Sequence, residues 1–436
     1  MRRCFVSCLL FLFPFCLGSA AHASPPPPVS VSLVKEDVWA DRTVREESRG
    51  VEITLTFGDE CVVIHEDSLS FPEGRLVARD VSPDQLYLVR DLRPMVRRKG
   101  YDSLYSHGGF QLAVVKDPAG LTRVKRVSLR PVTGSVVVLE RSKVQRLEPN
   151  PKVERLLRML DSAHYEQCLS ALAEDQPTRY ACSDGELDAK NKIKRLFLEL
   201  GLETEVMAFK NVCGRTCQKV GGYNVIGIKR GSLRPNEYYL VGAHYDSTSG
   251  MPCRMAPGAN DNASGTAGVM ELARLFSRVE TEASLIFVAF SGEEYNQLGS
   301  RKYVRRLLNS GLDKKLKAFV VLDMISYYKR NYGIIVEGSN GTTAQKAMVA
   351  RLARLGRTYT DLAVETTYDY YGSDHEPFLD RGMAGALLIE TDWDRYDYYH
   401  TRRDKMVYQD IPYAMEALKL AAALLAEGGI IFPADR

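Results

Sequence analysis

The sequence of 436 residues contains 58 lysines and arginines against 55 aspartates and glutamates, so its formal net charge is only +3. This near-balance argues against a nucleic-acid-binding protein, which normally shows a strong basic excess. Hydrophobic residues make up 45% and charged residues 26% of the chain, as in ordinary globular proteins, which argues against wholesale disorder and a polytopic membrane protein. The length suggests two or three domains.

Residues 1–23 have the pattern of a secretory signal peptide. Arg2 and Arg3 supply the positive start, and residues 5–17 form an apolar core. Ala21-His22-Ala23 then matches a small-x-small cleavage site. The apolar run is too short to favour a membrane anchor, and no other stretch is apolar enough to span a bilayer. We therefore expect a secreted protein, extracellular or periplasmic, with no membrane association once the signal is removed.

Six of the nine cysteines lie outside the predicted signal peptide. An even number in an exported protein predicts disulfide bonds. Cys213 and Cys217 could close a small loop, and Cys168 with Cys182 is a second candidate pair. Six cysteines allow about 15 complete pairings, so the connectivity stays open.

Residues 24–150 are expected to form a smaller, β-rich N-terminal domain. Polar and apolar residues alternate over 29–34 and 51–57, and further strand-like runs cover 85–89 and 136–139. We find no cluster of catalytic residue types in this region. The pattern changes at Pro149-Asn150-Pro151, where we place the domain boundary.

Residues 151–436 have the alternating pattern of an α/β domain. Apolar residues recur at helical spacing over 153–173 and 186–200, and after that strands and helices alternate. The expected strands are 238–243, 285–290, 319–322, 334–336 and 386–389, and the expected helices between and after them are 265–278, 301–308, 344–355 and 415–427. This alternation predicts a mixed, mostly parallel sheet with helices on both faces.

Histidines and carboxylates follow the predicted strands at the points where they end. In an open α/β sheet, functional sites form beyond the carboxyl ends of the strands, so these side chains should meet at one edge. The residues concerned are His244, Asp246, Glu293, Glu294 and Asp323, to which a loop adds Asp261 and the C-terminal region adds His400. Two histidines and several carboxylates, with no cysteine among them, suit a hydrolytic zinc centre, and a bridging carboxylate helps to hold two cations together. Asp246, two residues after His244, is placed to accept the second ring N–H of that histidine.

Taken in order, these motifs resemble the M28 family of zinc metallopeptidases, which are co-catalytic and mostly exported aminopeptidases. The resemblance extends from about Tyr165 to the C-terminus. Its motifs are His244-x-Asp246, the loop Gly258-Ala-Asn-Asp-Asn-Ala-Ser-Gly265, Gly292-Glu-Glu294, Asp323, Ser373-Asp-His-x-Pro-Phe378 and Tyr399-His-Thr401. It implies a zinc-exopeptidase-like fold for residues 151–436, whereas the β-rich region lies outside it.

The resemblance also implies a role for each residue. Two zinc ions are expected, with Asp261 as the bridging ligand. The other ligands would be His244 and Asp323 for one ion, and Glu294 and His400 for the second. Glu293 would act as general base towards a zinc-bound hydroxide.

Three further residues are expected beside the ligands. Tyr399 matches a position where some relatives use a tyrosine hydroxyl to hold the oxyanion of the transition state. Asp374 and His375 are expected to support the ligands or to line the pocket, without binding metal themselves.

The sequence therefore predicts a secreted two-zinc aminopeptidase that acts on peptides with a free N-terminus. A glutaminyl cyclase of the same fold, with one zinc, is the nearest alternative; the loop around Asp261 and the tyrosine before His400 favour the peptidase. A carboxypeptidase or dipeptidase would need a basic residue for the substrate carboxylate, for which Arg254 or Arg395 are candidates. A non-catalytic relative is disfavoured because no ligand is missing. The sequence does not determine the oligomeric state.

Overall fold

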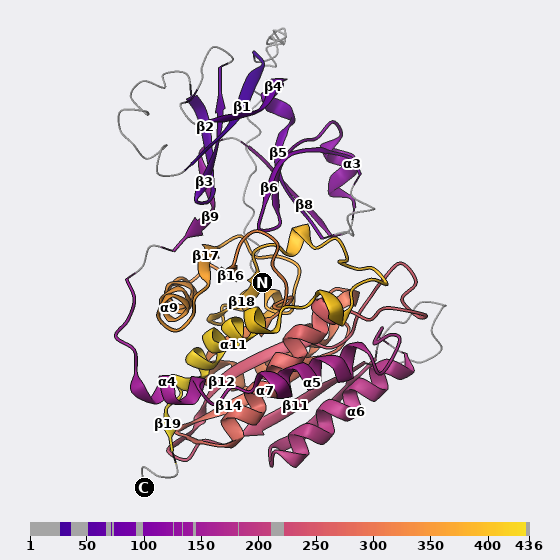
Figure 1. The fold of residues 1–436 in the computed structure, drawn as a ribbon, viewed down its shortest axis with the longest axis vertical. Coiled ribbons are helices and arrows are strands. Elements are labelled where there is room, and N and C mark those ends of the chain that lie inside the picture. The colour runs from indigo at the N-terminus through magenta and orange to yellow at the C-terminus, as the bar shows by residue number, and fades with distance from the viewer. Residues whose placement is uncertain are drawn as a thin grey trace, which may run out of the picture.

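A computed structural model of the chain describes residues 27–35, 51–66, 71, 74–92, 99–124, 126–132, 134–142, 145–181, 183–210 and 222–432. The N-terminal strands lie at one end of the molecule, and the α/β region forms the rest (Figure 1). Within these described residues, none of the helices is both long and apolar enough to cross a membrane. The predicted signal peptide, residues 1–23, lies outside the described part of the chain.

The α/β region is built on a mixed sheet, which confirms the predicted fold class. Its strands lie in the order β10-β11-β14-β12-β15-β18-β16-β17. Strands β14, β12, β15 and β18 run parallel to one another, whereas β10, β11 and β16 each pair antiparallel with a neighbour. The bounds are β10 (Glu203–Phe209), β11 (Gly222–Lys229), β12 (Arg234–His244), β14 (Ala283–Phe290), β15 (Leu316–Leu322), β16 (Gly333–Glu337), β17 (Ala363–Thr367) and β18 (Gly385–Glu390). A separate two-stranded ladder joins β13 (Glu280–Thr281) to β19 (Ile430–Ile431).

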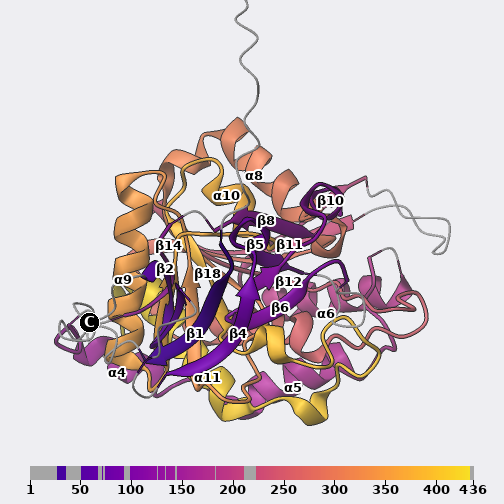
Figure 2. The same cartoon turned by 90° about the horizontal axis from the view of Figure 1, so that it is seen from above.

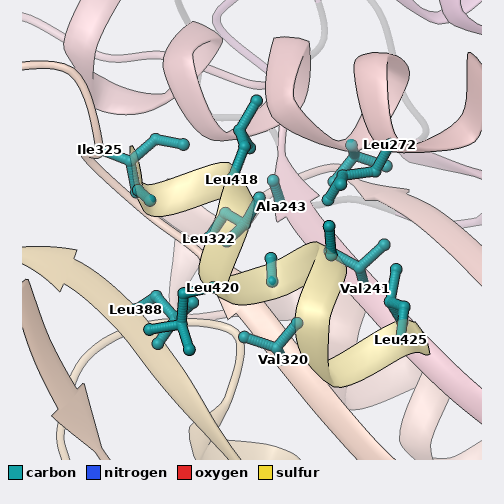
Figure 3. Packing of buried hydrophobic residues seen from close by; sticks show 14 of the residues in the cluster. Val241, Ala243, Leu272, Val320, Leu322, Ile325, Leu388, Leu418, Leu420 and Leu425 are labelled. Atoms are coloured by element: carbon teal, nitrogen blue, oxygen red, sulfur yellow. The ribbon is translucent and has the colours of Figure 1, made fainter. Parts of the chain in front are cut away.

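Most helices cover one face of this sheet. Successive side chains of a strand point to opposite faces, so Val241 and Val320 face one layer while Leu240 and Val321 face the other. The first layer packs against α4 (Pro151–Leu157), α5 (Ser162–Ala173), α6 (Asp184–Glu199), α7 (Gly265–Ser277), α9 (Thr343–Tyr359) and α11 (Ile411–Ala426). Figure 3 shows leucines of α11 and α7 between strand residues of this layer. This packing holds the strands, and hence their ends, in fixed positions.

On the opposite face, two further helices of the described residues join the apolar packing, α8 (Leu298–Ser310) and α10 (Glu376–Leu379). The rest of its apolar cover comes from the β-rich region, because residues such as Phe57 and Leu88 belong to the same buried cluster as Leu240 and Phe319. Seen from above, the N-terminal strands lie across the middle of the α/β region (Figure 2). The two regions therefore share one hydrophobic core.

The β-rich region also extends the main sheet. Strand β9 (Val136–Arg141) pairs antiparallel with β17, and the sheet continues through β2, β3 and β1 to β4. The bounds of these strands are β1 (Val29–Lys35), β2 (Val51–Gly58), β3 (Glu60–His65) and β4 (Arg75–Val81). A second sheet of β5 (Leu86–Asp91), β6 (Asp102–His107), β7 (Phe110–Val114) and β8 (Val127–Pro131) lies beside it, with the short helix α3 (Pro118–Thr122). The predicted boundary near residue 150 coincides with the start of α4, yet the sheet crosses it.

The cysteines differ from the predicted pairing. Cys168 is a buried free thiol on α5, so the predicted Cys168–Cys182 bond does not form. Cys61 on β3 is also buried, in the apolar packing of that strand, which can accommodate its side chain as a small hydrophobic group. Cys253 is disulfide-bonded. The predicted Cys213–Cys217 pair lies outside the described residues.

A buried ion pair joins the two regions and gives the fold a predicted pH dependence. His107 on β6 lies 2.9 Å from Glu365 on β17, with both side chains buried. Burial alone would lower the pKa of His107, but the hydrogen bond and charge of Glu365 outweigh it and raise that pKa above its ordinary value of 6.5. Since the folded-state pKa is the higher one, this stabilisation is complete below pH 6.5 and is lost as the pH rises through the raised value.

We therefore expect His107→Gln to lower the free energy of unfolding more at pH 6 than at pH 9. A hydrogen bond to a charged group contributes about 1.5–3 kcal/mol. Denaturant unfolding of both proteins across this pH range measures the difference, with Glu365→Gln as the partner variant in a double-mutant cycle. A difference that grows with rising pH would contradict the assigned pair.

Candidate metal centre

Four of the expected side chains lie at or just beyond the ends of neighbouring parallel strands. His244 is the last residue of β12, Asp323 directly follows β15, and Glu293 and Glu294 form a 3-10 turn soon after β14. Because β14, β12 and β15 are adjacent and parallel, their carboxyl ends meet at one edge of the sheet. The sequence-predicted residues are thus brought to one place by sheet order alone.

Asp261 reaches the same place from the loop 258–264. The carboxylate of Asp404 accepts hydrogen bonds from the backbone N–H groups of Asn260 and Asp261, at 2.9 and 3.0 Å. Asn260 donates in turn to the buried Glu390 at 2.6 Å. Gly258 opens the loop with a φ of 54°, and a Cβ there would meet Asp261 O at 2.4 Å, so only glycine fits. These contacts hold the Asp261 carboxylate towards the strand ends.

A buried arginine, Arg179, stabilises this loop through hydrogen bonds. Arg179 donates to the carbonyl oxygens of Tyr245, Pro257 and Gly258 at 2.8, 2.5 and 2.8 Å. Its side chain is almost completely inaccessible. Buried carbonyl groups need donors, so Arg179 fixes the loop and the residue after His244 in one arrangement.

Two groups of potential ligand atoms share Asp261. In the first, His244 Nε2 lies 3.3 Å from Asp261 Oδ1 and 3.4 Å from Asp323 Oδ1. In the second, His400 Nε2 lies 3.0 Å from Asp261 Oδ2 and 3.1 Å from Glu294 Oε1. Each oxygen of Asp261 therefore faces a different histidine. Among the described residues these are the two groups whose ligand atoms all lie within 4.8 Å of one another.

The free carboxylate oxygens fit a pair of metal ions. Asp261 Oδ2, Glu294 Oε1 and Asp323 Oδ1 are buried and accept no hydrogen bond, although each faces an imidazole nitrogen. Buried carboxylate oxygens without a partner are costly, so this arrangement needs cations. Ligand atoms about 2.0–2.1 Å from a tetrahedral zinc lie roughly 3.3 Å apart, which matches the spacing within both groups.

Asp246 contacts both His244 and the turn that carries the two glutamates. The ring Nδ1 of His244 lies 3.1 Å from the backbone carbonyl of Asp246, while the carboxylate is 3.6 Å away. That carboxylate instead accepts from the backbone N–H groups of Glu293 and Glu294 at 3.1 and 3.3 Å. Its main contact is with the turn that presents the two glutamates, because their N–H groups have no other partner at the start of that turn.

Glu293 points into a small cavity beside the ligands. The cavity is lined by Glu293, Asp261, Asp323, His400 and Tyr399 from the α/β region, and by Arg90, Leu92 and Arg126 from the β-rich region. Burial raises the pKa of the Glu293 carboxyl well above its ordinary value, against the opposing charges of His244 and Arg126. A carboxylate with a raised pKa can accept a proton near neutral pH, as a general base must.

The pKa of the adjacent Glu294 is shifted in the opposite direction. Burial works to raise its pKa, but the charges of His400 and Arg126 outweigh burial and lower it. Burial likewise opposes the charged form of His400, and the neighbouring Glu294 and Asp261 raise its pKa to about 9. The pKa values of the two consecutive glutamates are therefore shifted in opposite directions, which suits Glu294 to bind a cation and Glu293 to carry a proton.

Tyr399 stacks on the imidazole of His400, with 3.9 Å between the ring centroids. Burial raises the pKa of its phenol well above the ordinary value, so the hydroxyl stays a hydrogen-bond donor. Asp374 and His375 lie directly before α10 and are completely buried. His375 Nε2 contacts Glu337 at 3.0 Å, and burial raises the pKa of Asp374 to about 7.

Some functional residues were not predicted from the sequence. Neither Arg254, which is exposed, nor Arg395, which bonds to Asp392 and Ser106, lines the cavity. The arginines that do line it are Arg90 and Arg126, both in the region where no catalytic cluster was found. No local signal marks them, because each meets its partner in the α/β region more than 150 residues away along the chain.

Comparison with known proteins agrees with this geometry. Residues 224–425 match the model of peptidase family M28. A probable zinc metalloprotease of Pyrenophora tritici-repentis is 31% identical over 223 residues, which are 43% of this chain and 51% of the relative. Aminopeptidase YwaD of Bacillus subtilis is 30% identical over 209 residues, or 47% of this chain and 44% of the relative. The chain thus spans about half the length of these curated relatives.

Solved structures share the fold at lower identity. LapB from Legionella pneumophila superposes with a TM-score of 0.55 at 20% identity, covering 79% of this chain and 98% of LapB. A glutaminyl cyclase from Fimbriiglobus ruber superposes with a TM-score of 0.50 at 19% identity, covering 64% of this chain and 96% of the cyclase. Because both identities are low, these similarities speak for the fold alone.

Proposed function

We propose that this chain is an exported aminopeptidase of the M28 type with two zinc ions, because residues 224–425 match the model of peptidase family M28. The observation that carries the proposal is the pair of ligand groups that share Asp261. A centre for one ion needs only one such group. His244 and Asp323 would hold one zinc, and Glu294 and His400 the other, with Asp261 between them.

The protein groups around this centre suit hydrolysis of a peptide bond. Bound zinc would supply Lewis acidity, which polarises the scissile carbonyl and acidifies the attacking water. Glu293 takes the proton of that water on its carboxylate and delivers it to the departing amine. The hydroxyl of Tyr399, on the cavity wall, donates a hydrogen bond to the carbonyl oxygen as negative charge develops there.

The backbone keeps these groups in place during the reaction. Asp246 holds the N–H groups of the turn that carries Glu293, and Asp404 holds those of the loop that carries Asp261. Asp404 is itself fixed by the hydroxyl of Tyr396 at 2.7 Å. Such support limits misplacement of the base relative to the ligands, to which catalytic rates are sensitive.

The cavity beside the ligands is small and is bounded on one side by the β-rich region, which contributes Leu92 and Arg126. The carboxylates of Glu293, Asp261 and Asp323 line it from the α/β region. A long stretch of peptide has no room in so confined a space, which supports removal of terminal residues over cleavage within a chain.

A panel of substrates tests the proposal. Peptides with a free N-terminus are expected to lose their first residue, while the same peptides with an acetylated N-terminus are expected to stay intact. Treatment with a chelator should abolish the cleavage, and added zinc should restore it. Cleavage of the acetylated peptides, or full activity in the presence of the chelator, would refute the assignment.

The same panel distinguishes the glutaminyl cyclase. A peptide that begins with glutamine would form pyroglutamate and release ammonia in a cyclase, but would release free glutamine in an aminopeptidase. The second ligand group around His400 supports the aminopeptidase. Export remains part of the proposal on the pattern of residues 1–23, and detection of a shortened chain outside the cytoplasm of the producing cell would test it.

A further inference from the structure

Arg126 of the β-rich region touches a proposed metal ligand. It lies in the turn before β8 and has a φ of 67°. Its Nη2 donates to Glu294 Oε2 at 2.9 Å and to the backbone carbonyl of Glu294 at 3.3 Å. The Arg126 side chain is 29% exposed and that of Glu294 is 2% exposed, so the contact is largely shielded from water.

The two carboxylate oxygens of Glu294 therefore have different surroundings. Oε2 is held by Arg126, whereas Oε1 accepts no hydrogen bond and faces His400 Nε2 at 3.1 Å. A carboxylate held in this way can offer only one oxygen to a cation. The donor also fixes the rotation of the carboxylate plane.

The other ligand group has the same design. Asp323 Oδ2 accepts from the hydroxyl of Ser373 at 2.6 Å, and Oδ1 accepts no hydrogen bond and faces His244. Glu294 and Asp323, the two carboxylates that would not bridge the ions, thus each have one oxygen that accepts a hydrogen bond from the protein and one that is free to bind metal. Ser373 belongs to the α/β region itself, whereas Arg126 comes from the N-terminal region.

We propose that Arg126 is a positioning residue for the metal subsite formed by Glu294 and His400, which makes the β-rich region a structural part of that subsite. The inference rests on the proposed two-zinc function. Arginine suits the task because its guanidinium group carries several donors in a fixed plane: Nη2 donates to both the carboxylate and the carbonyl of Glu294, and Nη1 lies 3.4 Å from His400 Nδ1. Its positive charge also repels a nearby zinc ion. The proposal therefore requires that the benefit of orienting Glu294 outweigh this repulsion.

Zinc titration of the full-length protein, first stripped of metal, tests this role without relying on activity. The wild type is expected to bind two zinc ions. Arg126→Ala should weaken one site about 10–100-fold, the usual cost of losing a group that orients a ligand, and should leave the other unchanged. Arg126→Lys keeps the charge but loses the planar guanidinium group. Its affinity for zinc at the affected site should lie between those of the wild type and Arg126→Ala. Ser373→Ala should weaken the other site.

Arg130→Ala is the matched control. Arg130 lies on β8, four residues from Arg126. Its side chain is 48% exposed and, within the described part of the chain, forms an ion pair with the exposed Asp369 at 3.5 Å. It should bind both zinc ions like the wild type. Thermal unfolding of the metal-free variants shows whether each one is folded.

The outcomes separate this inference from the proposed function. If folded Arg126→Ala binds two zinc ions at least as tightly as the wild type does, the positioning role is overturned and the two-zinc proposal stands. A single site in the wild type would refute the two-zinc proposal itself. Weakening of both sites together in Arg126→Ala would show a general structural effect and would also overturn the inference.

Discussion

Glu293→Gln is expected to reduce turnover by about 10²–10⁴-fold while both zinc ions stay bound. The amide keeps the size of the side chain but cannot accept a proton, and Glu293 is in neither of the two ligand groups. Its raised pKa, caused by burial, fits proton transfer near neutral pH. Steady-state kinetics on an amino-acyl substrate and metal analysis of the purified variant give the two readouts.

The neighbouring residue provides the matched control. Glu294→Gln should lose zinc and activity together, because Glu294 Oε1 belongs to the second ligand group. The backbone of both residues is held by the same carboxylate of Asp246, so a difference between the variants reflects the side chains. Full activity in Glu293→Gln would remove the base assignment, and loss of zinc in that variant would make Glu293 a ligand.

Removal of residues 24–149 is expected to abolish both zinc loading and solubility of the remaining chain. The deletion exposes the edge of β17, which pairs with β9 through Glu365 and Thr366. It also uncovers the sheet face that contains Leu240 and Phe319, where the β-rich region completes the core. Unpaired strand edges and large apolar patches promote association between chains.

Soluble yield, size-exclusion chromatography and zinc content of residues 150–436 measure this effect, with residues 24–436 as the control. Addition of residues 24–149 as a separate chain during refolding should restore part of the soluble, zinc-loaded protein. A soluble monomer of residues 150–436 with two zinc ions would show instead that the β-rich region is dispensable for folding and for the centre.

The fold class was predictable because it follows from local periodicity. Apolar runs such as 285–290 and 319–322 became the buried strands β14 and β15, and the helical spacing over 186–200 became α6. The helix predicted over 153–173 is in fact divided into α4 and α5, with Asp161 capping α5. That division depends on a cap, which the spacing of apolar residues does not report.

The separation into two independent domains was harder to judge from the sequence. The change of pattern at residue 150 falls directly before the first residue of α4. It does not show that β9 pairs with β17, because strand pairing depends on edges and faces that exist only after both regions fold. The same holds for Cys168, whose burial on α5 as a free thiol depends on how that helix packs.

The sequence by itself determined which side chains gather at the proposed centre. His244, Asp323 and the two glutamates lie where apolar strands end, and parallel strands bring such ends together. The tertiary structure alone decided what holds them there. Arg126 meets Glu294 across 168 residues of chain and Asp404 meets Asp261 across 143. A charged residue that will be buried against a distant partner has the same local sequence as one exposed to water, so only the folded chain distinguishes the two.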